Sequence, residues 1–179
     1  MTKWRAAMLA AFWTKKPARS GIVGMAAVLT YFAYALWFYN WVTPIDQLSL
    51  LIHEAGHPVI GIFSDRLMVY GGTLFQLLFP ALFCQHFLKD DNALGFAFGL
   101  GWLSTSVHAM GVYLADARAQ VLPLVGNGDR IHDWNDILNR WGLLAWDLKL
   151  GGLINALSWL VLFSAFFLIW NLWRARKDD

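Results

Sequence analysis

Residues 51–60, LIHEAGHPVI, place two histidines and one glutamate inside a segment that is otherwise apolar. In an α-helix, residues four apart stand on the same face, so His53 and His57 can direct two imidazole nitrogens at one ion. Glu54 follows about 100° around the helix, close enough to act as a general base on a water bound to that ion. This HExxH pattern predicts a zinc site on a helix.

The segment lies in a chain whose composition is typical of an integral membrane protein. Of 179 residues, 58% are hydrophobic and only 15% are charged. An ionisable group within hydrocarbon costs at least ~2.5 kcal/mol on insertion scales, so each one needs a compensating partner, which a metal can provide. Glu54 is the only glutamate in the sequence, which separates it from a population of surface carboxylates. The composition therefore favours a functional role for the HExxH residues.

Outward from HExxH, apolar runs predict an all-α, polytopic membrane protein with five or six transmembrane helices. Five runs approach the ~20 residues that cross hydrocarbon. They cover residues 21–42, 45–63, 73–88, 93–115 and 150–173. Residues 134–149 are too polar to span comfortably, and their apolar residues recur at helical spacing, which indicates an interfacial helix. We expect a single transmembrane domain over residues 1–179, closed by the C-terminal span.

Basic residues near the N-terminus set the expected orientation. Residues 1–20 carry five lysines and arginines, which favours a cytoplasmic N-terminus in a bacterial-type inner membrane. Counting spans from there places the loop at residues 89–92 on the opposite side. The side of the C-terminus stays open, because it depends on whether residues 134–149 cross. The net charge of +2 is small, so the lipid bilayer is an expected partner and nucleic acid is not.

Two stretches of the sequence resemble the site-2 protease family, membrane-embedded zinc metalloproteases that cut substrate helices within the bilayer. The stretches are HEAGH, residues 53–57, and the glycine-containing GGTLFQLLFP, residues 71–80. The resemblance covers roughly residues 45–140 and implies a metalloprotease-like core there. It also implies zinc as the cofactor, Glu54 as the catalytic base and a membrane protein or peptide as the substrate. Gln76 stands where the family commonly has an asparagine.

The third zinc ligand is less clearly marked. In the family it is an aspartate, followed by glycine, in a segment introduced by a proline-containing loop. Here LPLVGNGDRIHDWNDIL, residues 122–138, has the loop but carries HDW where Asp-Gly is expected. We expect His132 to complete the ligand set, because it is an imidazole at a predicted helix start. Asp133, which could cap that helix or orient the ring, Asp116 and His108 are the other candidates.

Two other function classes fit the same residues. Histidines on facing helices, such as His57 and His108, are typical of a haem-binding electron-transfer subunit. A non-catalytic scaffold subunit of a larger membrane complex would instead keep zinc for folding. A Soret band would identify the first class, and bound zinc without turnover would identify the second. The single cysteine, Cys84, cannot form an internal disulfide and leaves the compartment open.

Overall fold

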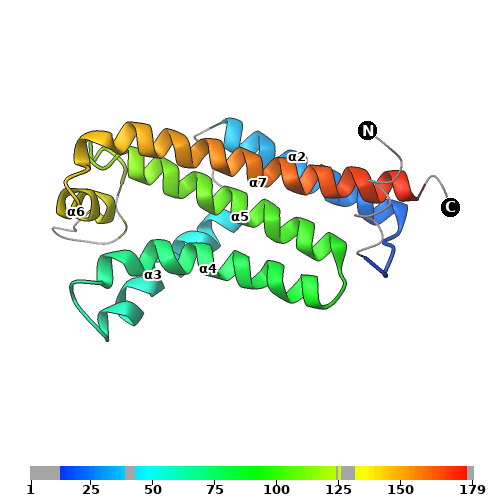
Figure 1. Cartoon of the computed structure of the whole chain (residues 1–179), viewed down its shortest axis with the longest axis horizontal. Helices are drawn as coiled ribbons and strands as arrows, with labels where there is room; N and C mark the ends of the chain where they lie inside the picture. Colours follow the sequence, from blue (N-terminus) through cyan, green and yellow to red (C-terminus); the bar gives the residue numbers. More distant parts are fainter. Residues whose placement is uncertain (1–12, 39–42, 124, 126–131, 177–179) are drawn as a thin grey trace. The chain divides into compact units, whose positions relative to one another are not determined.

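The computed structural model describes residues 13–38, 43–123, 125 and 132–176, and every regular element among them is helical (Figure 1). The elements are α2 (Arg19–Trp37), α3 (Pro44–Gly61), α4 (Met68–Lys89), α5 (Ala93–Ala115), α6 (Asp133–Arg140), the 3-10 turn η1 (Leu144–Trp146) and α7 (Asp147–Ala175). Each of the five apolar runs corresponds to a helix: α2, α3, α4, α5 and α7. The all-α prediction is therefore confirmed for the described residues.

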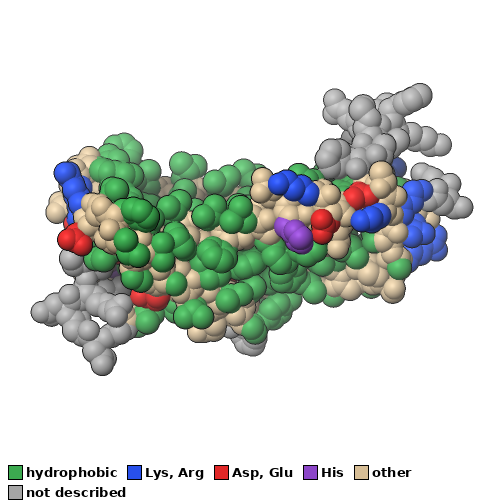
Figure 2. Space-filling view, turned by 90° about the horizontal axis from the view of Figure 1, so that it is seen from below, with side chains coloured by type: hydrophobic (Ala, Val, Ile, Leu, Met, Phe, Trp, Pro, Cys, Tyr) green, Lys and Arg blue, Asp and Glu red, His purple; other side chains and the backbone are tan. Residues whose placement is uncertain are grey.

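Among the described residues, three segments are long and apolar enough to cross a membrane: α2, α4, and η1 together with α7. Large apolar side chains are exposed along them, including Val23, Leu74 and Leu153. Hydrophobic side chains also cover much of the face seen in Figure 2. Exposed apolar surface of this extent marks contact with lipid or another protein. The chain therefore has the character of a membrane protein, and the expected five or six spans stay a prediction.

The predicted interfacial helix over residues 134–149 is broken in the structure. Gly142 has φ of +68°, and the Leu143 N–H donates to the carbonyl of Leu138 at 2.8 Å. This left-handed residue with its backward hydrogen bond is a common helix C-terminus, and glycine adopts it without a Cβ penalty. α6 consequently ends at Arg140 after eight residues. Eight residues rise only ~12 Å, too little to cross a bilayer.

The chain divides into two compact units by its internal contacts. Unit 1 comprises residues 1–41, 79–104 and 159–179, and unit 2 comprises residues 42–78 and 105–158. α4, α5 and α7 each run from one unit into the other. The expected single transmembrane domain stays a prediction. Of the predicted basic N-terminus, residues 1–12 lie outside the described residues.

In unit 1, the N-terminal segment contacts the hairpin between α4 and α5. Asp91, with φ of +53°, accepts hydrogen bonds from the backbone N–H of Thr14 at 3.0 Å and of Lys15 at 2.8 Å, and also from the Thr14 hydroxyl. The Lys15 ammonium donates to the carbonyl of Asp90 at 2.8 Å. The start of the described chain is thus fixed to this hairpin.

The C-terminal end of α7 contacts the same N-terminal segment. The Arg176 guanidinium donates to the carbonyls of Pro17 at 3.1 Å and Lys16 at 3.0 Å. Together with the hairpin contacts, these bonds hold residues 14–17, Arg176 and the hairpin on one face of any membrane that the helices cross. The prediction that residues 89–92 lie opposite the N-terminal segment is therefore wrong, because a count of spans does not register contacts between distant segments.

In unit 2, α3 and α4 touch backbone to backbone at Gly56 and Gly71. A Cβ on either glycine would collide with the carbonyl of the other. Small residues permit this close approach of two helices. α3 begins with a capping box in which Thr43 and Asp46 satisfy each other's backbone N–H groups. The HExxH turn is thereby held against the first turns of α4.

An apolar cluster and hydrogen bonds from Asn135 and Arg140 hold α6 against the rest of unit 2. Leu138 is buried with Leu114 and Ala117 at the end of α5. The Asn135 amide donates to the carbonyl of Ala117 at 2.7 Å, and the Arg140 guanidinium donates to the carbonyl of Arg66 at 2.7 Å. The short helix is therefore held both at the end of α5 and at the loop between α3 and α4.

Candidate metal centre

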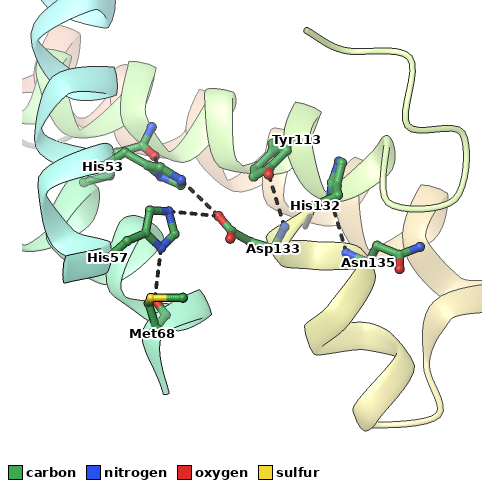
Figure 3. Close-up of polar contacts among 8 residues, drawn as sticks. His53, His57, Met68, Tyr113, His132, Asp133 and Asn135 are labelled. Atoms are coloured by element: carbon green, nitrogen blue, oxygen red, sulfur yellow. Dashed lines mark hydrogen bonds and ion pairs between the residues drawn. The ribbon is translucent and has the colours of Figure 1, made fainter. Parts of the chain in front are cut away.

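His53, His57 and Asp133 each bring one ligand atom to the same point in unit 2 (Figure 3). Asp133 Oδ2 lies 3.1 Å from His53 Nε2 and 3.3 Å from His57 Nε2. All three atoms lie within 4.8 Å of one another. Ligands bonded at ~2.0–2.2 Å to a tetrahedral ion stand roughly 3.3–3.6 Å apart, which these separations approach. The cluster could therefore hold one metal ion.

The two histidines meet because α3 is helical through both of them. They are four residues apart, on one face of α3, and their ring centroids are separated by 4.9 Å. His53 is buried, and His57 is partly exposed toward a cavity. The spacing in the sequence thus correctly placed both rings side by side.

Contacts behind the histidines fix the orientation of both rings. His53 Nδ1 lies 2.9 Å from Gln76 Oε1, and His57 Nδ1 lies 2.9 Å from the carbonyl oxygen of Met68. An amide or carbonyl oxygen only accepts, so in each neutral ring Nδ1 donates and the Nε2 lone pair faces the cluster. This arrangement is typical of metal-bound histidines, whose second nitrogen donates to an oxygen.

Asp133, the first residue of α6, completes the group. Its backbone N–H donates to the Tyr113 hydroxyl at 3.1 Å, which fixes the turn that carries the carboxylate. Burial alone would raise the pKa of Asp133, but its close contacts with the His53 and His57 imidazoles outweigh burial and hold that pKa below its usual value. An ionised carboxylate that faces two imidazole nitrogens suits a divalent cation between them.

His132, the expected third ligand, does not join this group. As the N-cap of α6, its Nδ1 accepts the Asn135 N–H at 3.3 Å, and its ring stacks on Tyr113 with centroids 4.1 Å apart. Its Nε2 lies 3.4 Å from Asp116 Oδ2. The extended backbone of the N-cap turns this side chain back over the helix start, whereas Asp133 faces the histidines. The structure thus groups Asp133, one of the other candidates, with His53 and His57.

Asp116 and His108 also lie apart from the metal group found among the described residues. The Asp116 carboxylate accepts the backbone N–H groups of Val121 at 3.0 Å and Leu122 at 3.1 Å, so it holds the loop that follows α5. The ring nitrogens of His108 are buried and have no hydrogen-bond partner in the described part of the chain. Neither residue contributes a ligand atom to the cluster.

Gly72 has no side chain, which keeps the space next to His53 Nε2 and His57 Nε2 open. A Cβ at this position would lie 2.6 Å from His57 Nε2 and even closer to His53 Nε2. A side chain at this position would therefore clash with both nitrogens and displace the rings. Glycine at residue 72 is the one amino acid that keeps this space free of a side chain.

Replacing Gly72 by alanine is expected to lower zinc affinity by on the order of 10- to 100-fold or more, because the new methyl group displaces both imidazoles. Gly152→Ala, at a position on α7 with nothing within 4 Å of a new Cβ, is the matched control and should leave affinity unchanged. Zinc titration against a competing chelator measures both. Wild-type affinity in Gly72→Ala would contradict the placement of the two rings.

A cavity of about 720 Å³ opens onto the cluster, entirely within unit 2. His53, His57 and Asp133 line it, together with Glu54. Apolar residues form much of the remaining wall, among them Leu50, Pro58, Val69 and Ala109. The residue predicted to be the general base therefore faces the same space as the candidate ligands.

Sequence reasoning missed four contributors to the site: Tyr113, the Met68 carbonyl, the open position at Gly72 and the ring contact of Gln76. Gln76 had been noted only for its place in the family pattern. The Met68 carbonyl carries no sequence signal, because any residue could supply it. Tyr113 stands near the end of an apolar run, where an interfacial tyrosine is ordinary.

No family model matches this chain, and neither a curated protein nor a solved structure matches it.

Proposed function

We propose that the chain is a membrane-embedded zinc metalloprotease that hydrolyses a peptide bond of a membrane protein or peptide. The observation that carries the proposal is the convergence of His53 Nε2, His57 Nε2 and Asp133 Oδ2 in a cavity that Glu54 also lines. Two imidazoles and a carboxylate without a thiolate suit zinc. Three protein ligands leave a fourth position for water, as in catalytic zinc sites.

The residues divide the chemistry between them. Zinc, when bound, lowers the pKa of a coordinated water and polarises a carbonyl. Glu54 takes a proton from the attacking water as the water oxygen bonds to the scissile carbonyl carbon. Glu54 then passes that proton to the amide nitrogen as the carbon–nitrogen bond breaks. Gln76 and the Met68 carbonyl hold the two imidazoles in place throughout.

The cavity supports an apolar polypeptide substrate. Its wall combines the polar cluster with aliphatic side chains such as Leu50 and Val69. A substrate helix must unwind locally before hydrolysis, because its own hydrogen bonds shield the peptide bonds. Peptide segments of low helix propensity are therefore the preferred test substrates.

The proposal replaces the expected five or six membrane crossings by four, in α2, α4, α5 and α7. Residues 14–17, Arg176 and the α4–α5 hairpin are held on one face. The chain therefore crosses an even number of times between residue 17 and the hairpin, and again between the hairpin and Arg176. α2 and α4 are long and apolar enough to cross and supply the first pair, so α3 makes no full crossing of its own in this proposal. α7 with η1 is also long and apolar enough, and we propose α5 as its partner in the second pair. With the basic N-terminus in the cytoplasm, the C-terminus and the hairpin are cytoplasmic as well.

Protein purified in detergent is expected to carry close to one zinc per chain and to cleave a fluorogenic apolar peptide. Elemental analysis measures the metal, and removal and restoration of zinc should abolish and restore cleavage. Bound zinc with no cleavage of any peptide would favour the scaffold alternative. A Soret band in the visible spectrum, with no zinc, would favour the haem alternative and contradict the proposal.

A further inference from the structure

Tyr113 is a further polar side chain beside the candidate metal group. It lies in the last turns of α5 and lines the same cavity as Glu54 and the three candidate ligands. Its ring contacts His53, with centroids 6.0 Å apart, on one side and His132, at 4.1 Å, on the other (Figure 3). The two imidazoles therefore hold the phenol in one position.

The Tyr113 hydroxyl is oriented by a hydrogen bond in which it is the acceptor. The donor is the backbone N–H of Asp133, at 3.1 Å, so the phenol oxygen lies next to the residue that supplies the third ligand atom. A phenolic hydroxyl can accept and donate at the same time. Accepting from Asp133 therefore leaves its own proton free to be donated to a group in the cavity.

The neighbouring side chains are committed to other tasks. Glu54 is needed as a proton acceptor, and the second nitrogens of His53 and His57 donate away from the cavity. His132 caps α6 and faces Asp116 with its other nitrogen. Tyr113 thus combines a position beside the ligand cluster, a fixed oxygen and a proton to donate.

We infer that Tyr113 is a further catalytic residue, which donates its O–H to the scissile carbonyl oxygen as that oxygen becomes negatively charged. The inference rests on the proposed peptidase function. When the water oxygen bonds to the carbonyl carbon, the π electrons move onto the carbonyl oxygen and a water proton moves to Glu54. Tyr113 hydrogen-bonds the resulting oxyanion and keeps its own proton. When the carbon–nitrogen bond breaks, the proton on Glu54 moves to the leaving nitrogen.

A preorganised donor aimed at a developing oxyanion stabilises the transition state more than the substrate. Loss of one such donor typically costs about 100- to 1,000-fold in kcat. A residue that only supports the fold would instead change zinc content, or KM and kcat together. Zinc content, kcat and KM therefore distinguish a catalytic role of Tyr113 from a structural one.

The test compares Tyr113→Phe with the wild type in zinc content, kcat, KM and affinity for a phosphinic peptide, which mimics the tetrahedral intermediate. Tyr113→Phe is expected to keep its zinc and to leave KM within a few-fold. Its kcat and its phosphinic-peptide affinity are both expected to fall about 100-fold or more. Tyr70→Phe is the matched control, because Tyr70 packs on Trp141 outside the cavity wall, and it should match the wild type.

Three results would overturn the inference. If the wild type is active and Tyr113→Phe keeps its zinc with a nearly unchanged kcat, Tyr113 has no catalytic role and the proposed function stays intact. Loss of zinc in Tyr113→Phe would make the residue a support for Asp133. A zinc-loaded wild type that cleaves no peptide and binds no phosphinic peptide would overturn the proposed function itself, and the inference with it.

Discussion

Glu54→Gln is expected to retain the zinc of the wild type while peptide hydrolysis falls by ~100-fold or more. Glutamine keeps the size and the hydrogen-bonding capacity of glutamate but cannot take a proton from water. The three candidate ligand atoms come from other residues, so metal binding does not depend on the substituted carboxylate. Elemental analysis and single-turnover cleavage of the same preparation measure the two quantities together.

Asp65→Asn is the matched control for this charge change. Asp65 is an exposed acid in the loop between α3 and α4 and does not line the cavity. Its conversion to an amide should leave both zinc and turnover at wild-type levels. Full activity in Glu54→Gln would show that the only glutamate of the chain is structural and that another group is the base.

Asp133→Ala is expected to remove zinc almost completely, because it deletes one of three ligands and leaves only His53 and His57. His132→Ala should keep zinc with an affinity lowered by about 10- to 100-fold, since His132 positions the start of α6 without joining the ligand group. Zinc content after dialysis against a weak chelator separates the two outcomes. The reverse ranking of the two variants would restore His132 as the third ligand.

Asp136→Ala provides the control for Asp133→Ala on the same helix. Asp136 pairs with Arg140 at 2.6 Å, one turn along α6, and supplies no ligand atom. Its loss should leave zinc binding unchanged. If Asp136→Ala also released zinc, the effect of Asp133→Ala would reflect loss of α6 rather than loss of a ligand.

The sequence predicted the parts of the site that depend on helical periodicity. The four-residue spacing of His53 and His57 was sufficient to place both rings on one face of α3, because helix geometry alone determines that result. The apolar runs likewise predicted five helices whose existence the structure confirms. In both cases the information is local, carried by residues within a few turns of one another.

The third ligand could not be predicted in the same way. His132 and Asp133 are adjacent, and which of them faces the histidines depends on the backbone at the start of α6. The N-cap conformation of His132, with φ of −73° and ψ of 112°, turns its ring toward Tyr113 and Asn135. That choice follows from packing between α5 and α6, which residue spacing does not record.

The break at Gly142 and the position of the 89–92 loop were missed for related reasons. Apolar periodicity continued through Gly142, and only its positive φ ends the helix. The loop was placed by counting spans, whereas its position follows from hydrogen bonds between Asp91 and residues far away in the sequence. Tertiary contacts thus decided both points against the local pattern.

The contact between Gly56 and Gly71 restricts the route by which a polypeptide can reach the cavity. With the two backbones in direct contact, the seam between α3 and α4 is closed at this height and admits no chain. A lateral gate between these two helices is therefore ruled out at the crossing. Entry must follow another edge of the cavity, where Ala109 of α5 and Pro123 of the following loop form the wall. The HExxH helix therefore need not part from α4 to admit a substrate.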